Sequence, residues 1–100
     1  MRRHEFLRVQ GRGSKIRTRS LLVLHLKNKL GNTRLGIAVS RKYGGSVARN
    51  RIKRLIREVF RKNRWLFPAS ADVVVIPKRV RHPVSYQILL DELAQAGKKR

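Results

Sequence analysis

The chain has 100 residues, of which 41% are hydrophobic, and its net charge is +21. This length suits one domain covering residues 1–100, and the hydrophobic share argues against disorder over most of it. The charge indicates a polyanionic partner, because self-repulsion of this size strains a compact fold. The chain lacks cysteine, which excludes disulfides and thiolate metal sites. Neither a membrane-spanning run nor a signal-peptide stretch is present, so we expect a cytoplasmic protein.

The chain begins with a predicted short helix. Residues 2–10 place Phe6 and Val9 on one side, and Gly11 and Gly13 are expected to end the helix. Phe6 has two interpretations, because an aromatic ring here can either pin the helix to a sheet or stack on an unpaired base. The pattern of residues leaves both open.

Strands are predicted next. Residues 20–27 form a short apolar run bounded by charge, and residues 34–40 form a second run. Gly and Asn at 31–32 tolerate positive φ, which predicts a hairpin turn that pairs these two strands. A further short strand is predicted around residues 15–18.

Residues 47–63 predict an amphipathic helix, although the segment is densely basic. Its apolar residues recur at i, i+3, i+4, i+7 and i+8, which forms a single stripe. Burying this stripe against a sheet contributes roughly 1.5–3 kcal/mol per large side chain and leaves the charges outside. Ser46 is expected to cap the helix by accepting a bond from an early backbone N–H. The stripe consists of Ile52, Leu55, Ile56, Val59 and Phe60. The opposite side of the helix consists of Asn50, Arg54, Arg57 and Arg61.

The helix is expected to end before Pro68, with Trp65 and Phe67 forming a core plug. Residues 72–77 are an unbroken apolar run, which predicts a strand that is buried on both faces and therefore central.

The last predicted element is an amphipathic helix over residues 84–96 with Ile88 and Leu89 turned inward, followed by a frayed basic tail at 97–100. Taken in order, the elements predict an α+β sandwich in which helices pack on a small sheet.

The side chains offer little catalytic chemistry. The neighbours Asp91 and Glu92 point about 100° apart on a helix, and the histidines lack the spacing of metal ligands. We therefore predict no catalytic residue and no metal ligand among the side chains. The chain's acids are Glu5, Glu58, Asp72, Asp91 and Glu92, and its histidines are His4, His25 and His82.

The basic residues point instead to binding. Residues 41–64 hold ten basic side chains and one acid, whereas a merely solvated surface is normally of mixed sign. Arginine outnumbers lysine there, and its planar fork suits phosphate. Asn50 can reach a ribose hydroxyl or a base edge. This pattern predicts nucleic-acid binding without choosing between DNA and RNA.

Residues 40–61, SRKYGGSVARNRIKRLIREVFR, are very similar to the signature of the protein subunits of bacterial ribonuclease P. Within them, ARNRIKRLIRE resembles that family's arginine- and asparagine-rich helix. The segments EFLRVQGRGSKIRTRSLLVLHL, RLGIAVS and DVVVIPK also match, so the resemblance covers nearly the whole chain. It implies a four-stranded mixed sheet with three helices, in the order α-β-β-β-α-β-α, as in the second domain of ribosomal protein S5.

The resemblance also implies a function. It is removal of the 5′ leader from precursor tRNA by a ribonuclease P holoenzyme, whose RNA subunit carries the active site and requires magnesium. The protein would bind the RNA subunit and the leader, lower the magnesium requirement, hold no cofactor of its own and be inactive alone. Its implied partners are ribonuclease P RNA and the precursor tRNA leader, with neither DNA nor membrane.

Site residues follow from the same resemblance. Where family members often carry further aromatic residues in the leader cleft, this chain has Gln10 and Leu24. The residues implied in binding the RNA subunit are Arg49, Asn50, Arg51, Lys53, Arg54, Arg57 and Arg61. Those implied in leader binding, around a cleft between the first helix and the sheet, are Phe6, Gln10, Arg17, Arg19, Arg41, Lys42, Lys78 and Arg79.

Two other classes of binding protein remain alternatives at this stage. A ribosomal protein would bind ribosomal RNA tightly and leave tRNA processing unaffected. A DNA-binding protein is disfavoured, because YGGSV at 43–47 is not a helix-turn-helix turn and no dimer seam is evident.

Overall fold

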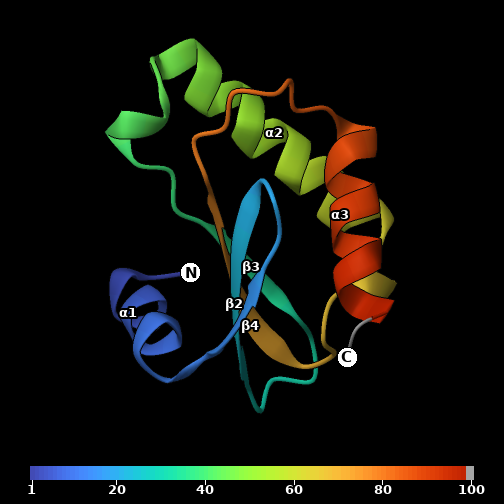
Figure 1. Cartoon of the computed structure of the whole chain (residues 1–100). Helices are drawn as coiled ribbons and strands as arrows, with labels where there is room; N and C mark the ends of the chain where they lie inside the picture. Colours follow the sequence, from blue (N-terminus) through green and yellow to red (C-terminus); the bar gives the residue numbers. More distant parts are fainter. Residues whose placement is uncertain (99–100) are drawn as a thin grey trace.

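The computed structural model describes residues 1–98 and shows a four-stranded sheet with helices on both faces (Figure 1). Helix α1 lies on one face, and α2 and α3 cover the other. Within the described residues this is the predicted α+β order of three helices and four strands. The elements are α1 (Arg3–Arg12), β1 (Ser14–Arg17), β2 (Leu21–Lys27), β3 (Arg34–Ile37), η1 (Arg41–Tyr43), α2 (Ser46–Lys62), η2 (Arg64–Leu66), β4 (Ala71–Pro77) and α3 (Tyr86–Lys98).

The strand order is β1-β2-β4-β3, so β4 is central, as its unbroken apolar run predicts. Strand β4 pairs antiparallel with β2 and parallel with β3. The predicted hairpin between residues 20–27 and 34–40 is therefore wrong, because β4 separates these strands. The hairpin that does form joins β1 to β2 through residues 18–20, where Thr18 N donates to Leu21 O at 2.9 Å.

The connection after β2 explains this topology. Asn28 is buried, and its side-chain Nδ2 donates to Asp72 in β4 at 2.9 Å. Its Oδ1 accepts bonds from Leu30 N and from the hydroxyl of Ser70, both at 3.0 Å. These bonds hold the loop at the start of β4. Gly31 does adopt φ +82°, but it turns the chain past β4 and not back along β2.

Helix α2 buries the predicted stripe. Ile52, Ile56, Val59 and Phe60 are buried against the sheet, and Leu55 is partly buried. The predicted cap is wrong, because Ser46 is already the first helical residue, Gly45 takes the cap position, and no side chain caps it.

The segment after α2 departs from the predicted core plug at one residue. Phe67 is buried and packs on Phe60, with ring centroids 5.0 Å apart. Trp65, by contrast, is 74% exposed. The short turn η2 directs its neighbour Leu66 towards the core, so the side chain of Trp65 is left outside.

The two terminal helices confirm the prediction in outline. Helix α1 buries Val9 but runs through Gly11 to end at Arg12. In α3, Leu89 is buried and Ile88 is only partly buried. The predicted tail at 97–100 is wrong for residues 97 and 98, which continue α3, and residues 99–100 lie outside the described part. No helix within residues 1–98 is long and apolar enough to cross a membrane.

Candidate nucleic-acid interface

The outer face of α2 carries unpaired cations. Because the apolar stripe faces the sheet, Asn50, Arg54 and Arg57 are exposed on the opposite side of the helix. Within residues 1–98, none of these three side chains makes a hydrogen bond or an ion pair. Their donors are therefore available to an external anion.

Two other arginines of α2 have partners inside the protein. Arg51 Nη2 donates to the carbonyl of Val84 at 3.0 Å, which ties the helix to the loop before α3. Arg61 Nη2 lies 2.8 Å from Glu58 Oε1, and Lys62 contacts the same carboxylate at 3.2 Å. These bonds from Arg61 and Lys62 lower the pKa of Glu58. Exposed ion pairs are weak, so a phosphate can readily replace Glu58 as the partner of Arg61.

The borders of the exposed face are half-buried. Arg49 and Lys53 lie there, and within the described residues Arg49 Nε is buried without a hydrogen-bond partner. The seven residues predicted to bind the RNA subunit thus share one helix, but only some of them present fully exposed side chains.

A hollow of about 300 Å³ lies beside the start of α2. Tyr43, Arg51, Arg79 and His82 line it. Burial raises the pKa of Tyr43, which keeps its hydroxyl protonated as a hydrogen-bond donor. Arg51 was predicted to bind the RNA subunit and Arg79 the leader, so the two predicted surfaces meet here.

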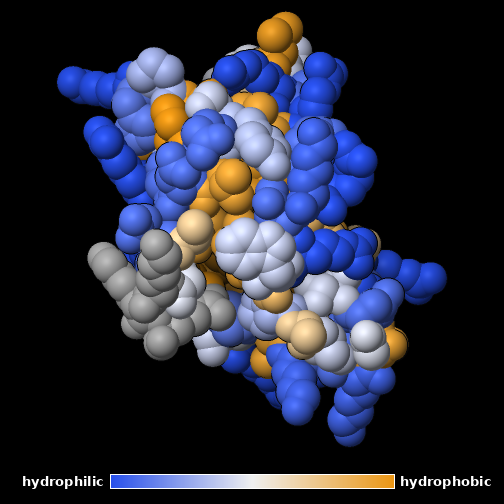
Figure 2. Space-filling model, turned by 90° about the vertical axis from the view of Figure 1, so that its right-hand side faces the viewer, coloured by the Kyte–Doolittle hydropathy of each residue, from blue (hydrophilic) through white to orange (hydrophobic). Residues whose placement is uncertain are grey.

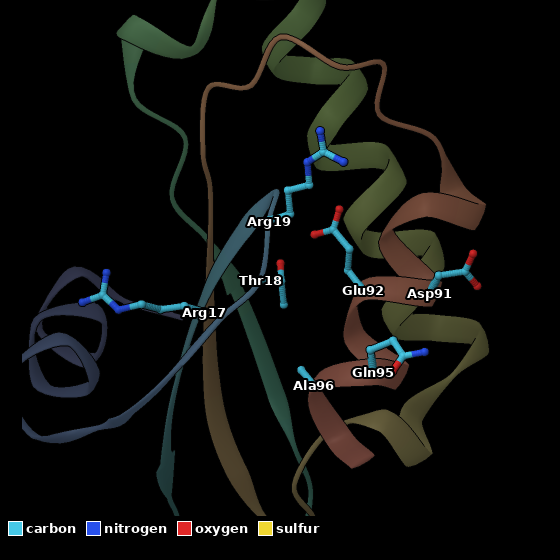
Figure 3. Close-up of a pocket in the computed structure, with 7 residues that line it drawn as sticks. All are labelled: Arg17, Thr18, Arg19, Asp91, Glu92, Gln95 and Ala96. Atoms are coloured by element: carbon cyan, nitrogen blue, oxygen red, sulfur yellow. The ribbon is translucent and has the colours of Figure 1, made fainter. Parts of the chain in front are cut away.

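The side of the sheet under α1 is only partly covered. The ring of Phe6 packs against Gly36 of β3, and the side chain stays half-buried. Gln10 is exposed one turn later, and Arg17 points towards α1 (Figure 3). Leu24 is buried with Val9 and cannot stack on a base.

The other predicted leader-binding residues lie apart from Phe6. Arg19 lies on the α3 side of the sheet next to Glu92, at a hollow of about 370 Å³ (Figure 3). Lys78 Nζ donates to the carbonyl of Thr18 at 2.6 Å and so braces the β1–β2 turn. Arg41 and Lys42 are exposed on η1. On the side that α3 covers, hydrophilic side chains surround a strip of apolar surface (Figure 2).

One polar cluster was missed by the sequence reasoning. Ser20 Oγ donates to Glu92 Oε2 at 2.6 Å and lies 2.9 Å from His82 Nε2, and its backbone N donates to Glu92 Oε1 at 2.7 Å. Burial acts to raise the pKa of Glu92, but the hydrogen bonds from Ser20 and Thr18, together with the nearby His82, outweigh it and lower this pKa. Ser20 and Glu92 are 72 positions apart in the sequence, so no local pattern indicated the cluster.

This cluster does not have the order of a catalytic triad. In a triad the histidine lies between serine and carboxylate and accepts the serine proton. Here Ser20 lies in the middle, is 2% exposed and donates its hydroxyl hydrogen bond to Glu92. The cluster therefore fastens the β1–β2 turn to α3. Among residues 1–98, no three His, Asp or Glu side chains gather as a metal site.

Comparison with known proteins places this arrangement in a family. The family model described as Ribonuclease P matches residues 1–100. The chain belongs to the ribonuclease P protein family. The ribonuclease P protein component of Thermotoga maritima is 42% identical over 77 residues, which is 77% of this chain and 66% of that relative. The component of Citrifermentans bemidjiense is 41% identical over 96 residues, which is 96% of this chain and 82% of that relative.

Solved structures agree with the ribonuclease P fold. The ribonuclease P protein of Thermotoga maritima superposes with a TM-score of 0.83 at 33% identity, covering 100% of this chain and 96% of that one. The predicted fold class, a four-stranded mixed sheet with three helices like the second domain of ribosomal protein S5, is thereby confirmed. The segment that resembles the family's arginine- and asparagine-rich helix forms α2, whose exposed face carries the unpaired arginines.

Proposed function

We propose that this member of the family assists a ribonuclease P RNA in removing the 5′ leader from precursor tRNA. The observation that carries the proposal is the exposed face of α2. Arg54 and Arg57 lie on it without partners among the described residues, opposite the stripe that holds the helix on the sheet. Guanidinium groups along one helix suit the phosphates of a folded RNA, because each group can make two parallel hydrogen bonds.

In this proposal the two faces of the protein bind different RNAs. The face of α2 binds the RNA subunit. The α1 side of the sheet, with Phe6, Gln10 and Arg17, binds the single-stranded leader. Residues 1–100 act as one unit, because the same sheet supports both faces.

The protein contributes charge to the reaction and leaves the chemistry to RNA. Magnesium ions held by the RNA subunit activate the water and stabilise the leaving oxygen when bound. The arginines of α2 and the leader-side cations offset phosphate repulsion between the RNA subunit and the substrate. Fewer magnesium ions are then needed to bring the two RNAs together, which lowers the magnesium requirement.

Cleavage of precursor tRNA tests this proposal. Protein rigorously freed of RNA is incubated alone, with a bacterial ribonuclease P RNA at low magnesium, and with that RNA at high magnesium. We expect no cleavage by the protein alone and a large increase in cleavage at low magnesium, with a smaller increase at high magnesium. Site-specific, metal-dependent cleavage by the RNA-free protein would overturn the proposal, and so would failure to stimulate the RNA.

A further inference from the structure

A third hollow lies at the far end of α2 from Arg49 and Asn50. Its volume is about 540 Å³, which falls in the range of ligand pockets. Residues 31–33 of the β2–β3 loop and residues 69–70 border it, together with η2. The aromatic pair of Phe60 and Phe67 forms its buried wall.

Trp65 stands at this hollow with its side chain in solvent. It is 74% exposed, although a tryptophan carries the largest apolar surface of any side chain. Beside it, Arg64 lies over the ring of Phe60, with Cζ 5.1 Å from the ring centroid. None of the residues that line the hollow is acidic, so the exposed ring sits in a positively charged setting.

The hollow is held in shape before any ligand arrives. Thr33 Oγ1 donates to the carbonyl of Pro68 at 2.6 Å, and Gly31 N donates to Ser70 Oγ at 3.2 Å. These bonds tie the β2–β3 loop to the segment after η2. Within the described residues the side-chain amide of Asn32 makes no hydrogen bond, so it can pair with a base edge. A preformed site loses less conformational entropy on binding.

We propose that Trp65 is a stacking site for an unpaired RNA base, with Arg64 binding the adjacent phosphate. Arg64 and Trp65 belong to η2, which follows the last residue of α2 after Asn63, so the hollow adjoins the C-terminal end of the helix that presents Arg54 and Arg57. An unpaired strand of an RNA bound on α2 reaches Trp65 where it extends past this end of the helix. The inference rests on the proposed function, because it takes the RNA bound by α2 as the source of the base.

Trp65 reports on this site directly, because it is the only tryptophan of the chain. Its fluorescence is followed while a short single-stranded oligoadenylate, a fully paired RNA hairpin, ribonuclease P RNA or precursor tRNA is added. Binding is measured in parallel by the anisotropy of labelled RNA. We expect saturable quenching by the oligoadenylate and ribonuclease P RNA and little quenching by the hairpin. Stronger quenching by precursor tRNA than by ribonuclease P RNA would assign the base to the leader and overturn the assignment to the RNA held by α2.

Three variants separate stacking from other roles. Base stacking on an aromatic side chain contributes roughly 1–3 kcal/mol, so Trp65→Ala should weaken oligoadenylate binding about five-fold or more. Trp65→Phe should retain most of the affinity, whereas Trp65→Leu, which is apolar but has no aromatic face, should not. Arg64→Gln should shrink the slope of log affinity against log salt by about 0.7–0.9, and Trp65→Ala should leave the slope unchanged.

The outcomes distinguish this inference from the proposed function. One outcome is that anisotropy shows RNA binding, but the emission of Trp65 does not change and the Trp65→Ala variant binds RNA with unchanged affinity. This outcome would overturn the stacking site and leave the proposed function intact. If sedimentation shows that the protein self-associates and that Trp65→Ala lowers its mass in solution, the exposed ring serves self-association and the stacking site is overturned. Quenching by oligoadenylate without stimulation of cleavage would support the stacking site and overturn the proposed function.

Discussion

The ring of Phe6 packs on the backbone of Gly36, so closely that a Cβ atom at residue 36 would lie 2.6 Å from Phe6 Cζ. Glycine in β3 therefore leaves the space that the α1 ring occupies. Phe6 is half-buried as a result, with one part of the ring on the sheet and another in solvent. The two roles that the sequence left open for this residue, packing and base stacking, are thus compatible.

Phe6→Ala should lower affinity for precursor tRNA and spare mature tRNA, which has no leader. We expect a loss of about five-fold, the lower end of the stacking range, because Gln10 and the buried Leu24 supply no second ring. The loss of stability should stay below the roughly 3–5 kcal/mol of a fully buried phenylalanine. Binding of both tRNAs and thermal melting are the measurements. A large fall in Tm with equal effects on both tRNAs would make Phe6 a core residue only.

Gly36→Ala should displace the Phe6 ring, because the new methyl group overlaps Cζ and Cε1. We expect a loss of roughly 1–3 kcal/mol, as for other overpacked sites. The same change made in a Phe6→Ala background should cost clearly less, because the overlapping ring is absent. Unfolding of the two single variants and the double variant in denaturant measures this coupling. Additive losses would show that residue 36 matters for another reason.

Arg54→Ala combined with Arg57→Ala should weaken binding to ribonuclease P RNA without unfolding the protein, because both side chains are exposed. If both meet phosphates, the slope of log affinity against log salt should shrink by about 1.4–1.8, at roughly 0.7–0.9 per contact. Arg3→Ala combined with Arg12→Ala removes the same charge from α1 and serves as the matched control. An equal change of slope in the control, or no change in the α2 variant with native circular dichroism, would argue against α2 as the contact.

Asp72→Asn should destabilise the fold. Asp72 is 4% exposed and accepts bonds from Arg34 at 2.8 and 2.7 Å and from Asn28 at 2.9 Å. Disrupting this buried set should cost about 2 kcal/mol, which at about 4–8 °C per kcal/mol is a clear fall in Tm. Asp91→Asn, at an exposed acid of α3, changes the net charge equally and should leave Tm nearly unchanged. Equal falls in Tm for Asp72→Asn and Asp91→Asn would show that the loss of stability comes from the change in net charge and not from the buried bonds of Asp72.

The same carboxylate should make stability depend on pH. Bonds from Arg34 lower the pKa of Asp72 despite its burial, and the backbone N–H of Arg2 together with Arg34 lowers the pKa of Glu5. Because both pKa values are depressed by folding, their stabilisation is present above about pH 4 and is lost as pH falls through the folded values. Tm should therefore drop below about pH 4, and less steeply in Asp72→Asn. Parallel Tm curves for the two proteins would contradict this.

Local patterns were enough to predict several elements. The stripe of α2 repeats at helical spacing, and four of its five apolar residues are buried, because the helix can turn only one face to the sheet. The unbroken run of β4 likewise predicted a central strand, since both of its faces are apolar. The exposed arginines of α2 follow from the same geometry, so that part of the candidate site was predictable from the sequence.

Tertiary structure decided the features that depend on distant partners. Residues 20–27 and 34–40 are both predicted as strands from their apolar runs. Whether β3 pairs with β2 or β4 depends on the bonds of Asn28 across the sheet. Trp65 and Phe67 are two residues apart and both are aromatic, yet only the direction of the η2 turn sends one outward and the other into the core. Spacing along the chain sets which face a side chain occupies, whereas packing between elements sets what that face meets.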